Sequence, residues 1–100
     1  MAAEIDLHLG RRLRRRRRLL GLTQQQLAVQ VGVRFQQIQK YECGANRISA
    51  ARLWELAEAL GTPIIYFYDG LGEVIERAAP SVSVEPFVRV ETLHTGSKAA

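Results

Sequence analysis

The chain has 100 residues, 47% hydrophobic and 24% charged, which suffices for one small domain or a small domain with a tail. Its positive charge lies before residue 71, where 11 Lys/Arg against 6 Asp/Glu leave a surplus of +5, as expected of a surface that meets phosphate. The single cysteine excludes an intrachain disulfide, and without a signal peptide or an apolar run of ~20 residues we expect a soluble, cytoplasmic protein with no membrane contact.

The first predicted helix runs from residue 5 or 6 to about residue 20, where a glycine ends it. Asp6 is the expected N-cap, because a carboxylate there accepts hydrogen bonds from free amides and suits the positive end of the helix dipole. Leu9, Leu13 and Leu20 form the expected inward stripe.

Five successive arginines occupy positions 14–18 of this helix. They cover more than one helical turn, so they cannot all share one solvated face, and one of them must lean toward the core. Three interpretations stay open for the others: contacts with DNA phosphates, simple solubility, and binding to anionic lipid. The helix has little exposed apolar surface, which disfavours the lipid.

Two short helices hinged at a glycine follow. Thr23 and Gln26 have the spacing of a capping box, which satisfies free amides at the start of a helix. Gly32 can adopt the left-handed conformation that ends this helix. After a three-residue turn we expect another helix over about 35–43, stopped by Gly44.

The helix over 35–43 has two contrasting faces. If Ile38 points inward and each residue turns by about 100°, Gln36 and Lys40 point almost directly outward. Gln37 and Gln39 flank them. Long amides and an ammonium group suit the donor and acceptor edges on the floor of the DNA major groove.

Further helices are predicted beyond residue 48. Ser49 is the expected N-cap of a helix that continues to about residue 60, with Trp54 packed beside its apolar stripe. Thr62 and Pro63 have the pattern of an N-cap followed by proline at the first helical position, which opens a short fifth helix over 64–68.

The fifth helix and the residue after its turn are unusually apolar. Ile64 and Phe67 are expected to close the core of the monomer. Two interpretations stay open for Tyr66, Tyr68 and Leu71: they complete the same core, or they form a contact between two copies of the chain.

The chain changes character after residue 71, so we expect a DNA-binding domain over 1–71 and a C-terminal extension over 72–100. A short helix over 73–79 would end at Pro80. Valines then alternate with polar residues over 82–90, which is the period of a half-buried strand, and Pro86 restricts it to an edge strand or two short pieces. The strand would pair with another chain, pack on the helices or stay disordered, and the end of the chain is expected to be mobile.

The order of these segments resembles the XRE-type helix-turn-helix regulators, the family of the phage repressors and Cro, and in particular an alphaproteobacterial subgroup. The resemblance covers about 9–71, including Gly-Leu-Thr-Gln at 21–24, Ile-x-x-Tyr-Glu-x-Gly at 38–44 and Arg-Leu-x-Glu-Leu-Ala-x-Ala-Leu-Gly at 52–61. It implies an all-α, five-helix repressor-like domain that binds double-stranded DNA as a homodimer. Arg34 and Phe35 depart from the small polar cap and polar reader that are common in the family.

The resemblance also implies roles for individual residues. Base contacts fall on Arg34, Phe35, Gln36, Gln37 and Lys40. Phosphate contacts fall on Arg16, Arg17, Gln24, Asn46 and Arg47. An ion pair between Arg17 and Glu42 would tie the first helix to the recognition helix. Arg34 could instead reach a phosphate, and Phe35 either packs inward or lies against a thymine methyl group.

Catalytic and metal-binding patterns are missing from the sequence. It has no glycine-rich phosphate loop, and His8 and His94 fall in an N-terminus expected to fray and in the tail. We therefore expect no enzymatic activity, no metal and no cofactor. Cys43 is either a tolerated small residue or an oxidant sensor beside the recognition helix.

These observations favour a bacterial, sequence-specific transcriptional regulator, a repressor on an inverted-repeat operator. The alternative is the antitoxin of a toxin–antitoxin pair, in which the C-terminal segment covers the toxin partner. A scaffold that binds only protein is disfavoured by the outward row of Gln and Lys.

Overall fold

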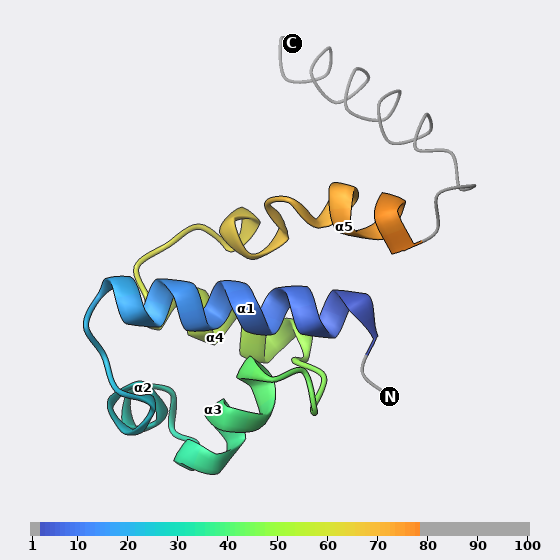
Figure 1. Cartoon of the computed structure of the whole chain (residues 1–100). Helices are drawn as coiled ribbons and strands as arrows, with labels where there is room; N and C mark the ends of the chain where they lie inside the picture. Colours follow the sequence, from blue (N-terminus) through green and yellow to red (C-terminus); the bar gives the residue numbers. More distant parts are fainter. Residues whose placement is uncertain (1–2, 79–100) are drawn as a thin grey trace, which may run out of the picture.

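The computed structural model describes residues 3–78, which form five α-helices and one 3-10 helix and contain no strand. The elements are α1 (Glu4–Leu19), α2 (Gln24–Val31), α3 (Phe35–Glu42), α4 (Ala50–Ala59), η1 (Ile64–Tyr68) and α5 (Leu71–Ala78). Helix α1 crosses the middle of the domain, with α2 and α3 on one side and η1 and α5 on the other (Figure 1). The predicted all-α fold is confirmed; the predicted strand over 82–90 lies outside the described residues.

The core is one cluster of buried side chains shared by α1, α2, α3, α4 and η1. Five side chains that are fully buried come from five different elements: Leu13, Leu27, Ile38, Leu56 and Phe67. Each contributes roughly 1.5–3 kcal/mol relative to an exposed position. The buried side chains of these five elements therefore form one shared core.

Side-chain caps begin two of the helices as predicted. The Thr23 hydroxyl accepts from the Gln26 amide at 3.0 Å, and the Gln26 side chain accepts from the Thr23 amide at 2.8 Å, which completes the capping box. The Ser49 hydroxyl accepts from the Arg52 amide at 3.1 Å. These bonds satisfy amides that have no partner inside the helix.

Three expectations for helix ends are wrong. The N-cap of α1 is Ala3, without a side-chain hydrogen bond, and Asp6 lies inside the first turn. The fifth helix is a 3-10 helix whose N-cap is Pro63 itself, and the helix predicted over 73–79 begins earlier, at Leu71. Because α1 ends at Leu19, Leu20 leaves the inward stripe and is 44% exposed.

Polar side chains of α1 hold η1 against it. His8, expected in a frayed terminus, is instead buried, and its Nε2 lies 2.8 Å from the carbonyl oxygen of Asp69. Arg12 donates to the carbonyl of Tyr66 at 2.9 Å, and its guanidinium lies 3.9 Å from the centre of the Tyr66 ring. The first turns of α1 are thus fixed by residues about 60 positions away in the chain.

No helix within residues 3–78 combines the length and the apolar character needed to cross a membrane. The predicted boundary between residues 71 and 72 falls after the first residue of α5, which packs along α1. The division of the chain into two parts stays a prediction.

Candidate nucleic-acid interface

Helix α3 turns a polar face away from the core. Ile38 is fully buried beneath the helix, whereas Gln36, Gln39 and Lys40 are exposed. Gln37 is half-buried beside them. This is the orientation expected from about 100° per residue, and it leaves the amides and the ammonium group free to meet an external ligand.

A tight turn joins α2 to α3. Gly32 has a φ of 81°, and the amides of Gly32 and Val33 both donate to the carbonyl of Ala28, at 2.8 and 3.0 Å. Arg34 is the N-cap of α3 and makes no side-chain capping bond, so its exposed guanidinium stands at the start of the polar face. Phe35 is 38% exposed, and its ring lies partly in solvent.

The carboxylate of Glu42 joins three helices. Arg17 of α1 donates to it twice, with Nε at 2.6 Å from Oε2 and Nη2 at 3.0 Å from Oε1. Gln24 of α2 donates to Oε1 at 3.0 Å, and a further Arg17 nitrogen donates to the carbonyl of Leu22 at 2.8 Å. The predicted ion pair is therefore present, and Gln24 also ties α2 to α3 through Glu42.

The geometry does not support the phosphate contacts expected of Arg16 and Arg17. Arg17 is only 8% exposed, and its guanidinium is engaged by Glu42 and by a carbonyl. Arg16 donates to the carbonyls of Leu60 and Gly61, at 3.1 and 3.3 Å, at the end of α4. Both arginines complete the fold, Arg16 by satisfying carbonyls that α4 leaves unpaired.

The loop after α3 presents Asn46 and Arg47, which are both exposed. The Arg47 side chain is 77% exposed, and its Nε lies 3.4 Å from a carboxylate oxygen of Asp6 on α1. The Asp6 side chain is only 10% exposed, whereas the Arg47 side chain lies largely in solvent, where it can also meet a phosphate.

A shallow hollow of about 440 Å³ lies between α3 and the first turn of α4. It is lined by Val33, Arg34, Gln36, Gln37, Lys40, Tyr41 and Arg52. Sequence reasoning missed Arg52, which also donates to the carbonyl of Val31 at 3.5 Å and to Glu55 at 3.0 Å. The sequence could have indicated Arg52, because it lies three residues after the N-cap of α4. The N-terminal turn of a helix attracts anions, and an arginine there adds positive charge.

Close backbone packing sets α3 against α1. Gly10 faces the last turn of α3, and a Cβ atom there would collide with the carbonyl oxygens of Tyr41 and Glu42. Sequence reasoning missed this glycine as well. Because glycine has no side chain, the backbones of α1 and α3 can touch here, and this contact helps to set the direction of α3.

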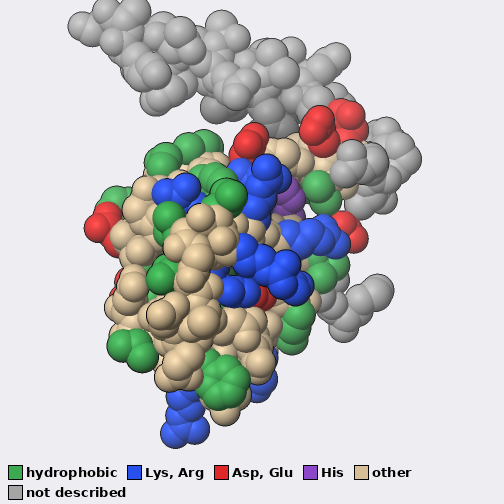
Figure 2. All heavy atoms as spheres, turned by 60° about the vertical axis from the view of Figure 1, so that its left-hand side comes forward, with side chains coloured by type: hydrophobic (Ala, Val, Ile, Leu, Met, Phe, Trp, Pro, Cys, Tyr) green, Lys and Arg blue, Asp and Glu red, His purple; other side chains and the backbone are tan. Residues whose placement is uncertain are grey.

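Basic side chains gather near the middle of the face that Figure 2 shows, among polar and apolar neighbours. Among the described residues, exposed cations occur on α1, at the start of α3 and within it, and in the loop between α3 and α4. A surface of this kind attracts the phosphates of a nucleic acid over distances of about 10 Å at 0.1 M salt.

The arrangement of α2, its tight turn and α3 matches a known pattern. A sequence family described as helix-turn-helix matches residues 13–67, more than half of the chain. The chain belongs to the XRE-type helix-turn-helix family. It carries the helix-turn-helix DNA-binding domain of that family, and the predicted resemblance is confirmed.

Relatives that share this XRE-type domain occur in alphaproteobacteria. An uncharacterized transcriptional regulator in the ATPase CF(0) region of Rhodospirillum rubrum is 57% identical over 67 residues, which are 67% of this chain and 62% of the relative. An uncharacterized HTH-type transcriptional regulator of Sinorhizobium medicae is 46% identical over 65 residues, which are 65% of this chain and 47% of the relative. The chain spans about half to two thirds of the length of these relatives.

Solved structures share the fold of this XRE-type domain. The restriction-modification controller protein C.AhdI from Aeromonas hydrophila superposes with a TM-score of 0.59 at 30% identity, covering 61% of this chain and 92% of the controller. The clp gene regulator ClgR from Corynebacterium glutamicum superposes with a TM-score of 0.67 at 26% identity, covering 86% of this chain and 88% of the regulator.

Proposed function

We propose that this protein is a transcriptional regulator, and that it acts as a repressor. It would bind an inverted-repeat operator as a homodimer, with α3 in the major groove. The observation that carries the proposal is the exposed polar row of α3, in which Gln36 and Lys40 stand opposite the buried Ile38. Buried Glu42 holds α3 to its neighbours, so the row is presented by a rigid support.

Two side chains of α3 suit particular bases. The amide of Gln36 can both accept from N6 and donate to N7 of adenine, and the ammonium group of Lys40 can donate to O6 and N7 of guanine. The half-buried Gln37 would contact a neighbouring base. Exposed Arg34 reaches a base or phosphate edge, and the exposed part of the Phe35 ring suits a thymine methyl group.

Other groups would fix the register of the domain on the duplex. Exposed Asn46 and Arg47, with the amides at the start of α4, are the phosphate donors we propose. Gln24 stands at the first turn of α2, where an amide hydrogen beyond its bond to Glu42 can reach a phosphate. Arg52 joins this group because it lines the same hollow as Gln36 and Lys40.

The homodimer would form through η1 and the start of α5. Ile65 is 68% exposed and Tyr68 is 40% exposed on one side of a hollow of about 550 Å³. Leu71 is half-buried at the start of α5. Tyr66 is a weaker candidate than predicted, because Arg12 covers its ring.

Selection of bound fragments from random DNA by the purified protein tests the proposal. We expect one enriched motif with two inverted halves, and gel shifts should show a dimer on it. Recovery of no shared motif would refute sequence-specific binding. Copurification of a small protein from the native host, bound to residues 72–100, would support the antitoxin alternative instead.

A further inference from the structure

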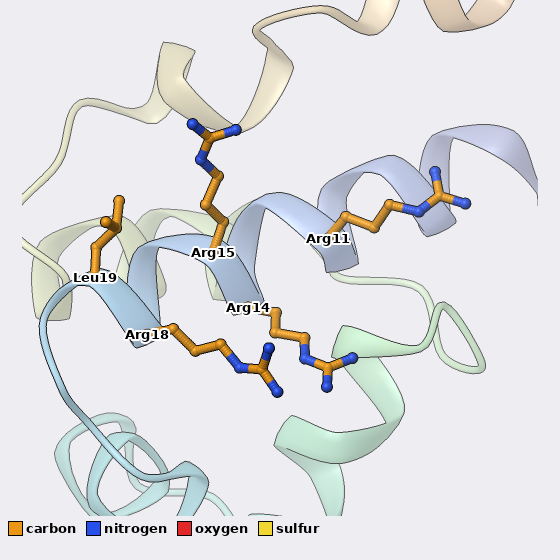
Figure 3. A pocket seen from close by; sticks show the side chains of 5 residues that line it. All are labelled: Arg11, Arg14, Arg15, Arg18 and Leu19. Atoms are coloured by element: carbon orange, nitrogen blue, oxygen red, sulfur yellow. The ribbon is translucent and has the colours of Figure 1, made fainter.

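The outer face of α1 carries an arginine stripe, formed by Arg11, Arg14, Arg15 and Arg18, all exposed. The stripe surrounds an open hollow of about 540 Å³ that Leu19 completes. In Figure 3, Arg14 and Arg18 project toward the side of α1 on which α2 and α3 lie, Arg15 projects toward η1, and Arg11 extends toward the start of α1.

The arginine stripe is not needed to hold the fold together. Arg12, Arg16 and Arg17 of the same helix each bind a carbonyl or carboxylate on another element. Within residues 3–78, no ion pair or side-chain hydrogen bond involves the stripe. Neighbouring members are three or four positions apart, no acid lies three or four positions from any of them, and like charges so placed destabilise a helix. A cost to folding without a compensating contact indicates an external anion.

The packing of α1 shows where that anion would lie. Gly10 marks the line on which α1 touches the end of α3. At about 100° per residue, Arg14 lies roughly 40° and Arg18 roughly 80° around the helix from Gly10. The stripe therefore begins beside the C-terminal end of α3 and continues away from the bases that α3 would read.

We propose that the arginine stripe binds, without regard to sequence, the phosphates of the duplex that flanks the bases read by α3. From Arg11 to Arg18 the helix rises about 10 Å, and one strand carries a phosphate about every 3.4 Å along the axis, so each stripe can meet two or three phosphates. The proposal rests on the proposed function, since it places the flank relative to α3.

The test compares two matched variants of the full chain on two DNA lengths. In one variant all four arginines of the stripe are changed to Gln, and in the other all four are changed to Lys, which keeps the charge. Each is titrated with salt on the selected operator, once with long flanks and once trimmed to the two half-sites. Circular dichroism melts establish whether both variants fold. If the fourfold Gln variant does not fold, a double variant with Arg14→Gln and Arg18→Gln replaces it.

On the long duplex we expect the Gln variant to lower the slope of log K against log salt by about 2–3 for each protomer, and the Lys variant to keep it. On the trimmed duplex the Gln variant and the wild type should have the same slope. An unchanged slope on the long duplex overturns the proposal, as does an equal loss on both lengths, which would reflect net charge alone.

Failure of the proposed function has a different signature. If Gln36→Ala leaves the ratio of specific to nonspecific affinity unchanged, α3 is not the reader. The arginine stripe is then tested on long and short random duplexes with the same two variants. A length-dependent loss of slope there supports the phosphate surface, and no loss overturns it.

Discussion

Glu42 shows how one buried charge organises the recognition helix. Its carboxylate accepts from Arg17 and Gln24, so α1, α2 and α3 meet at a single side chain. Removing one partner of a buried ion pair leaves an uncompensated charge, which is why such pairs are costly to break on one side. The orientation of the polar row on α3 thus depends on a residue that is itself buried.

At this residue we expect Glu42→Ala to lower the free energy of unfolding by about 3–5 kcal/mol, because Arg17 stays buried and loses its partner. Urea denaturation measures the loss. The control is the double variant Arg17→Met with Glu42→Leu, which removes both charges and should be much more stable than Glu42→Ala. A loss below 1 kcal/mol for Glu42→Ala would contradict the role we assign to the pair.

The reading residues can be separated from the positioning residues by their effect on specificity. Gln36→Ala removes no charge and should cost roughly 1–3 kcal/mol on the operator while hardly changing binding to random DNA. Arg47→Ala should weaken operator and random DNA about equally and lower the salt slope by about one unit for each lost phosphate contact. Fluorescence anisotropy at one salt concentration gives the ratio of operator to random-DNA affinity for both variants, and a series of salt concentrations gives the slope. An unchanged ratio for folded Gln36→Ala would remove α3 from the reading role.

Among the elements, those with local signals could be predicted from the sequence. The capping box of α2, the left-handed Gly32 and the Ser49 cap depend on residues within a few positions, and all three are present. The outward row of α3 followed from helical periodicity alone. The sequence could not show that His8 and Arg16 bind carbonyls, because those partners are 61 and 44 positions away.

The contact between α1 and α3 depends on Gly10, which a local pattern could not identify. We expect Gly10→Ala to destabilise the domain by about 1–3 kcal/mol, because the Cβ atom would meet backbone oxygens that cannot rotate away. The control is Gly72→Ala in α5, where the new Cβ would meet no atom of another element within 4 Å, and it should stabilise by about 0.4–1 kcal/mol. Thermal melts of both variants check the prediction. Equal melting temperatures would show that α1 and α3 can move apart freely.

For the whole molecule, the basic surplus predicts strongly salt-dependent binding. Arg34, Lys40, Arg47 and the arginine stripe are exposed cations on the surface proposed to meet DNA. A dimer with about 6–10 phosphate contacts should lose on the order of 10³–10⁵ in affinity between roughly 50 and 200 mM salt. Gel-shift titrations over this range provide the measurement. A flat response would argue against phosphate binding by any part of the domain.

Assembly is the last property that belongs to the whole molecule, and it depends on the apolar side chains that η1 leaves exposed. Ile65 is 68% exposed next to Tyr68, and burying such side chains against a second copy would remove apolar surface from water. Light scattering at micromolar concentration should therefore report about twice the chain mass of 11.2 kDa. We expect Ile65→Asp to halve this mass, because a carboxylate would be buried in the contact without a partner.

Val29→Asp is the matched control, since Val29 is 70% exposed but lies on α2, away from η1. It should leave the mass unchanged. The Ile65→Asp monomer should also bind an isolated half-site about as well as the wild type does, because α3 and its support are untouched, and lose most of its advantage on the full inverted repeat. A wild-type protein that stays monomeric and occupies only half-sites would refute the homodimer, whereas a dimer that survives Ile65→Asp would place the contact elsewhere on the chain.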